Sequence, residues 1–87
     1  MRWYYPATGK QTAQATFQKY HIGFLARNLI IQNSGTSDND LEISWDGTST
    51  HFQIESGEPL NLSGLEFSEV WIKKTGGTVT FRMAAYA

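Results

Sequence analysis

The chain has 87 residues, a formal net charge of −1 and no cysteine. This length fits one domain with one hydrophobic core, and the lack of cysteine excludes disulfides and thiolate metal sites. The first acid is Asp38, and the cations before it are Arg2, Lys10, Lys19 and Arg27. They are too sparse to follow a phosphate backbone, so we expect no nucleic-acid partner.

The sequence also argues against a membrane partner. No apolar run approaches the ~20 residues that a transmembrane helix needs. The opening MRWYYP lacks the continuous apolar stretch of a secretory signal. We therefore expect a soluble chain that begins at its own methionine.

Residues 1–16 are expected to form an extended N-terminal arm. The segment carries the aromatic cluster Trp3, Tyr4 and Tyr5, and then continues with polar or small residues that have no periodic apolar face. Aromatic side chains left in water favour aggregation, so these three residues are candidates for a protein interface.

Residues 17–87 are expected to form a single β-sandwich domain. Residues 17–25 have apolar residues at mixed spacing, which fits either a first strand or a loop on the core. Residues 27–33 are rich in β-branched residues and predict a strand, and 34–40 are typical of a loop. Apolar and polar residues alternate over 41–46, and the Asp46-Gly47 pair predicts a hairpin turn before a returning strand at 51–54.

The second half of the chain continues the same pattern. A short strand is expected at 60–62 with Pro59 at its entrance, and alternating strands are expected at 70–73 and 78–85, joined by a tight glycine turn at 75–77. Six to eight short strands without a helix predict an all-β fold, a small antiparallel β-sandwich or jelly roll. The residues expected in its core are Trp45, Phe52, Ile54, Ile72, Val79 and Phe81.

Candidate catalytic residues occur only along the predicted 41–54 hairpin. Ser44, Asp46 and His51 are the residue types of a hydrolase triad. Such a triad also needs an oxyanion hole and a cleft, which the face of a hairpin does not supply. We expect Asp46 to serve the turn and the other two to be exposed, so the chain is expected not to be an enzyme.

No cofactor or metal site is expected. The only histidines are His21 and His51, which are far apart in the sequence and have no ligand spacing around them. The loop at 38–40 (Asp-Asn-Asp) offers oxygen ligands but lacks the pattern of a calcium-binding loop. No glycine-rich phosphate-binding motif is present.

The register predicts different places for two tryptophans. Trp45 continues the apolar face of 41–46 and is expected in the core. Trp71 alternates with two apolar residues and is expected to face outward, which makes it the fourth interface candidate. We expect the Trp71 ring to contact a partner protein in the first place, the chain's own arm in the second and a sugar in the third.

Between Leu29 and Phe81 the chain resembles small β-sandwich virion proteins of tailed bacteriophages: head-decoration, head-fibre-base and neck or tail accessory proteins. The resemblance is carried by four stretches, which read LEISWDG (41–47), SGEPL (56–60), VWIK (70–73) and GGTVTF (76–81). It implies a non-enzymatic component of the virion that acts through repeated protein contacts, and the family has no catalytic residues to transfer.

The sequence thus leads us to expect a phage structural protein, located in the virion, that forms homo-oligomers and attaches to other virion proteins of the capsid, neck or tail. Two other functions stay open. One is a carbohydrate- or receptor-binding β-sandwich module, and the other is an accessory domain of an enzyme.

Overall fold

A computed structural model describes residues 2–5, 10–34 and 39–87, and these residues form nine strands. One sheet contains β1 (Trp3–Tyr4), β2 (Lys10–Thr12), β4 (Asn28–Asn33), β7 (Pro59–Leu62) and β9 (Thr80–Tyr86). The other sheet contains β3 (Gln18–Ala26), β5 (Leu41–Ser44), β6 (Phe52–Ile54) and β8 (Phe67–Lys74).

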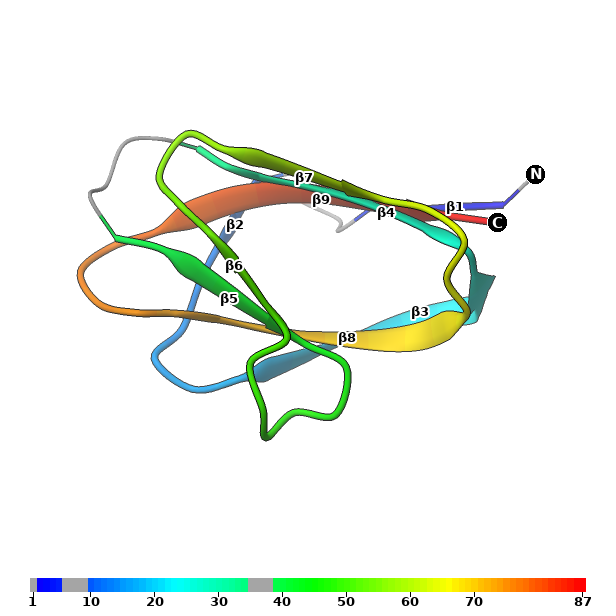
Figure 1. Cartoon of the computed structure of the whole chain (residues 1–87), viewed down its shortest axis with the longest axis horizontal. Helices are drawn as coiled ribbons and strands as arrows, with labels where there is room; N and C mark the ends of the chain where they lie inside the picture. The colour runs from blue at the N-terminus through cyan, green and yellow to red at the C-terminus, as the bar shows by residue number, and fades with distance from the viewer. Residues whose placement is uncertain (1, 6–9, 35–38) are drawn as a thin grey trace.

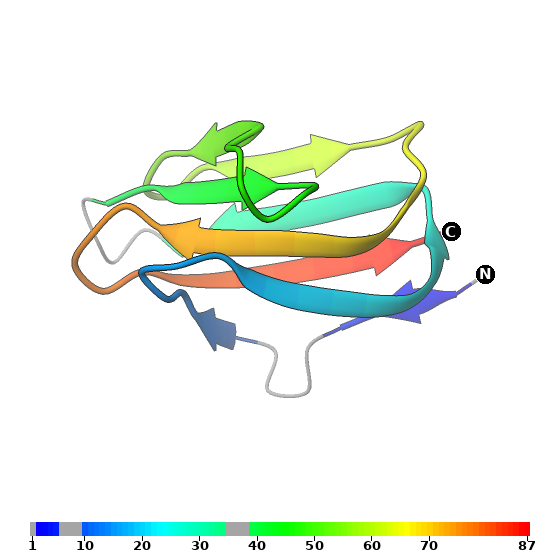
Figure 2. The ribbon, with the colours of Figure 1, turned by 90° about the horizontal axis from the view of Figure 1, so that it is seen from below.

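The two sheets pack face to face, as Figure 1 shows from the side and Figure 2 after a quarter turn. The first has the order β1-β9-β4-β7, with β2 also paired to β9, and the second has the order β3-β8-β5-β6. All the strand pairs are antiparallel. The prediction of a small all-β antiparallel sandwich is therefore confirmed.

The core lies between the sheets and follows the period of two along each strand. On β9, Phe81, Met83 and Ala85 are buried, whereas the residues between them point to the outer face. The predicted core residues Ile54, Ile72, Val79 and Phe81 are buried.

The other two predicted core residues, Trp45 and Phe52, are only partly buried. Trp45 follows the last residue of β5, and its ring packs against Phe52 and Phe67 with centroids 6.3 Å and 5.2 Å apart. The two rings therefore cover the rim of the core, because the chain has already left the sheet at Trp45.

The segment 1–16, expected to be an extended N-terminal arm, is extended in its described parts, and these parts belong to the sandwich. Both β1 and β2 pair with β9, and Ala13 is buried in the core. Residues 6–9 of the expected arm lie outside the described residues. Without this segment, β9 would be an edge strand with unpaired N–H and C=O groups. Deleting residues 2–12 would therefore leave that edge of β9 unpaired.

Residues 17–25, left open between strand and loop, belong mostly to β3. This edge strand pairs with β8, and its register shifts between His21 and Ala26, where Gly23 has a φ of +87°. Such a shift interrupts the regular edge of the sheet and hinders unwanted pairing with other chains. The opposite sheet ends at β7, whose first residue is Pro59, so the predicted entrance position is confirmed.

The predicted hairpin over 41–54 is present, because β5 and β6 are antiparallel neighbours and Gly47 has a φ of +81°. The last residues paired between the two strands are Ile43 and Phe52, so the connection is a loop at 44–51. The 75–77 glycine segment leads from β8 in one sheet to β9 in the other, so it connects the layers instead of closing a hairpin.

Replacing Phe81 by alanine should lower the free energy of unfolding by about 3–5 kcal/mol. The ring is completely buried and meets the Tyr20 ring edge-on at 5.9 Å. Urea unfolding followed by tryptophan fluorescence measures the effect, with the exposed Thr78→Ala as the control expected to change stability by less than about 0.5 kcal/mol. Equal stability of both variants would contradict the placement of Phe81.

Candidate interaction surface

Three aromatic rings stack on the outer face of the five-stranded sheet. The ring of Trp3 lies parallel to that of Tyr5 (centroids 5.8 Å apart, interplanar angle 4°) and stacks on that of Tyr86 (4.2 Å, 22°). Trp3 is 45% exposed and Tyr5 is 62% exposed. We call Trp3, Tyr5 and Tyr86 the aromatic stack.

The sequence places these rings together through alternation and register. Trp3 and Tyr5 are two residues apart in an extended segment, so their side chains share one face. Tyr86 is the cross-strand partner of Trp3 in the β1–β9 pair. The side chains of such a pair lie on the same face of the sheet, close enough for ring contact.

Tyr4 lies between two members of the aromatic stack but points to the other face. Its partner in β9 is the buried Ala85, and it packs against the hydrophobic core. Burial raises the pKa of Tyr4, and burial followed by the proximity of Tyr4 raises the pKa of Tyr20. Of the three expected interface aromatics in the N-terminal segment, Tyr4 therefore contributes to the core, whereas Trp3 and Tyr5 are exposed.

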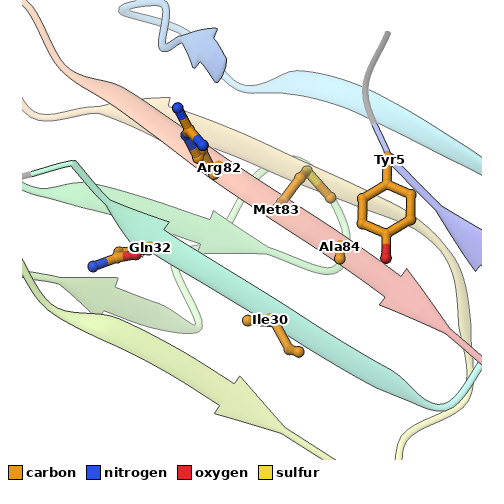
Figure 3. A pocket seen from close by; sticks show the side chains of 6 residues that line it. All are labelled: Tyr5, Ile30, Gln32, Arg82, Met83 and Ala84. Carbon is orange, nitrogen blue, oxygen red and sulfur yellow. The ribbon is translucent and has the colours of Figure 1, made fainter. Parts of the chain in front are cut away.

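A hollow of about 310 Å³ lies beside the aromatic stack (Figure 3). Its lining residues are Tyr5, Ile30, Gln32, Arg82, Met83 and Ala84. In Figure 3, Tyr5 stands next to Ala84, and Arg82 lies further along β9 on the other side of Met83. The hollow thus has an aromatic ring at one end, a guanidinium at the other, and aliphatic side chains between them.

Arg82 differs from the cations of the opposite outer face. There, Lys19 forms an ion pair with Glu69 (3.2 Å), and Lys73 forms one with Glu42 (3.7 Å). No described residue forms an ion pair with Arg82. On the outer face of the four-stranded sheet, both lysines therefore have a carboxylate partner. On the five-stranded sheet, the guanidinium of Arg82 has no carboxylate partner among the described residues.

Trp71, the fourth interface candidate, lies on the outer face of the four-stranded sheet, as its register predicted. Its neighbours Val70 and Ile72 are buried, and the ammonium of Lys19 lies 5.7 Å from the centre of its ring. A Cβ at Gly47 would lie only 2.8 Å from Trp71 Nε1, and Gly47 has a φ of +81°. The 44–51 loop therefore packs its glycine backbone against the Trp71 ring, which is half-buried.

Ser44, Asp46 and His51 are brought together by the 44–51 loop, but not as a hydrolase triad. Ser44 is completely buried, which differs from its expected exposure, and its hydroxyl donates to Asp46 Oδ1 at 2.9 Å. His51 Nδ1 accepts a hydrogen bond from the backbone N–H of Trp45 at 3.2 Å. The serine hydrogen is thus directed to the aspartate and not to the histidine.

The carboxylate of Asp46 organises this loop. Its Oδ1 accepts hydrogen bonds from the backbone N–H groups of Thr48 and Ser49, both at 2.9 Å. In turn, the Ser44 hydroxyl accepts from the N–H groups of Asp46 and Gly47. The hydrogen bonds from Ser49, Thr48 and Ser44 lower the pKa of Asp46 well below its usual range.

The described residues contain no group of three or more acidic, histidine or cysteine side chains that could hold a metal ion. In the 38–40 loop, Asp38 lies outside the described residues, and Asp40 accepts a hydrogen bond from Gln53 at 2.6 Å. Nor does any helix in the described part of the chain have the length and apolar character to span a membrane.

Sequence reasoning missed three residues of this surface: Ile30, Arg82 and Tyr86. The alternation predicted over 78–85 places Arg82 on the outer face, and an extension by one residue would have placed Tyr86 there too. It could not have shown that Tyr86 lies opposite Trp3, because that register depends on the pairing of β1 with β9.

No protein-family model matches the chain, and no curated protein matches it. No residue role can therefore be transferred from a relative, and the functional argument rests on the geometry of the aromatic stack and its hollow.

Stability should depend on the ionisation of Asp46. Because its pKa is lower in the folded than in the unfolded chain, its contribution is present above the unfolded value of about 3.9 and is lost as pH falls towards the folded value. Asp46→Asn should therefore destabilise the protein at pH 6, and the difference from wild type should shrink below about pH 4. Urea unfolding at several pH values measures it, and a difference that does not vary with pH would refute the role of the charge.

Proposed function

We propose that the protein is a non-enzymatic structural component of a phage virion, which forms oligomers and attaches to the capsid, neck or tail surface. The observation that carries the proposal is the aromatic stack, which exposes Trp3 and Tyr5 on the outer face of a sheet beside the hollow. Exposed aromatic side chains in a contiguous group are typical of a protein-binding surface.

The fold supports an assembly function in a second way. Its core is small, and the sequence has no cysteine to form a stabilising disulfide. Binding to a partner adds stability to a domain of this size. On a symmetric particle, many copies engaged at once turn weak single contacts into durable attachment.

The hydrogen bonds around Ser44 support the non-enzymatic part of the proposal. A nucleophilic serine needs a base that takes its proton, and here the hydroxyl is buried and donates to a loop-forming carboxylate. These polar groups have a structural role, because they accept hydrogen bonds from the backbone N–H groups of the loop.

Replacing Trp3 and Tyr5 together by alanine should strongly reduce binding to purified particles of the phage that encodes the chain, because the variant loses the exposed aromatic area. Leu25→Ala is the matched control, since Leu25 is also large, apolar and 52% exposed, but lies on β3 of the other sheet. Co-sedimentation with particles, after circular dichroism confirms folding, measures binding. Equal binding of both variants, or absence of the chain from the particles, would refute the proposal.

A second candidate function, glycan binding, is favoured by the side chains that line the same hollow. Sugars stack on aromatic rings and take hydrogen bonds from amide and guanidinium groups. Tyr5, Gln32 and Arg82 supply these three groups on one exposed face. Trp71 is less suited to stacking, because Lys19 and Gly47 already lie against its ring.

The glycan alternative makes a different experimental prediction. Binding to immobilised polysaccharides should be retained by a monomeric chain, lost in Tyr5→Ala, and unchanged in Trp71→Phe. Affinity electrophoresis with neutral and acidic polysaccharides measures this. Loss of binding only in Trp71→Phe would move the sugar site to the other sheet, and no retardation by any polysaccharide would exclude this second function.

A further inference from the structure

We propose that the hollow beside the aromatic stack is the contact surface of a two-fold symmetric dimer, in which Arg82 of each copy lies over Tyr5 of the other. The inference rests on the proposed function, because it names a second copy of the chain as the first partner of that same face.

Cation–aromatic contacts are used repeatedly within this chain. Lys73 Nζ lies 4.9 Å from the Phe17 ring centre, and Lys19 Nζ lies 5.7 Å from that of Trp71. Arg2 lies 5.8 Å from the Phe24 ring centre. Arg82 is an exposed cation that contacts no described ring and no described acid. It is therefore available to a partner.

The hollow holds both members of such a contact, but at opposite ends. Tyr5 follows the Tyr4–Ala85 pair and so lies beside Ala84, whereas Arg82 is two residues further along β9. Figure 3 shows this order, with Ile30 on the neighbouring β4. Within the described chain no cation–aromatic contact joins this guanidinium to the Tyr5 ring.

A two-fold axis through the middle of the hollow removes this separation. In a symmetric dimer, a contact from residue i to residue j is always matched by one from j to i. Rotation about this axis places each Arg82 over the Tyr5 ring of the other copy, and brings the two hollows, with Ile30 and Ala84 in each, face to face. Both cations then meet aromatic faces, and the aliphatic middle of the hollow is removed from water.

The described strand positions of this face carry no acid. By register, Asn28, Gln32, Asn61 and Thr80 are uncharged, and Lys10 of β2 is the cross-strand partner of Arg82. An acidic partner would also satisfy Arg82, but it would leave the exposed ring of Tyr5 without the cation that the copy supplies.

Sedimentation equilibrium of the full chain over a concentration series tests the dimer. The wild type should form dimers, and Arg82→Gln and Tyr5→Ala should each raise the dimer dissociation constant about tenfold or more, because each removes both symmetric contacts. Tyr5→Phe keeps the ring and should dimerise as the wild type does. Lys73→Gln is the matched control, since it removes a ring-bound cation from the opposite face.

Mixing the two weakened variants gives the decisive result. A mixed dimer of Arg82→Gln with Tyr5→Ala retains one intact contact, whereas each variant paired with itself retains none. The mixed dimer should therefore be tighter than either homodimer, which a general loss of packing would not produce. A monomeric wild type, association insensitive to both substitutions, or a mixed dimer no tighter than the homodimers would overturn the proposal.

The outcomes for this dimer and for the proposed function are separable. A monomer that still binds phage particles through Trp3 and Tyr5 would leave the proposed function standing and exclude the dimer. A dimer that depends on Arg82 but never binds particles would confirm the dimer and refute the proposed function. A monomer that instead binds a polysaccharide or an acidic protein at this face would also overturn the dimer.

Discussion

Strand β9 is the constraint on which the rest of the structure depends. It pairs with β4 along one side and with β1 and β2 in succession along the other. Because its side chains alternate, the same seven residues supply Phe81 to the core and Arg82 to the outer face. The core and the candidate interaction surface are thus two faces of one strand, and a change of its register by one residue would exchange them.

The two outer faces of the sandwich are built on different physical principles. On the outer face of the four-stranded sheet, charged side chains pair across strands. Lys19 and Lys73 each lie near both a carboxylate and an aromatic ring. Ion pairs of this exposed type contribute little stability, but they leave few unsatisfied groups for a partner to use. Among the described residues, the five-stranded sheet instead exposes rings and a guanidinium without an ion pair, which is the reason that we propose binding at that face.

The polar residues of the 44–51 loop show why residue types alone are weak evidence for catalysis. A loop of this length has backbone N–H groups that must find acceptors. Asp46 and Ser44 provide them, and the resulting fold lets Gly47 approach the Trp71 ring. A serine, an aspartate and a histidine close in sequence are therefore accounted for here by the hydrogen bonds of a turn.

The sequence by itself determined the all-β class, the outward side of Trp71 and most of the core, because the period-two alternation along a strand is a local property. Tertiary structure decided the pairing of β1 and β2 with β9, and therefore the separation of Tyr4 from Trp3 and Tyr5. Strands this short have too few residues to show a period, and they form only because β9 offers an unpaired edge. The stacking of Trp3 on Tyr86 joins the two ends of the chain, so it depends on a long-range register that no local pattern encodes.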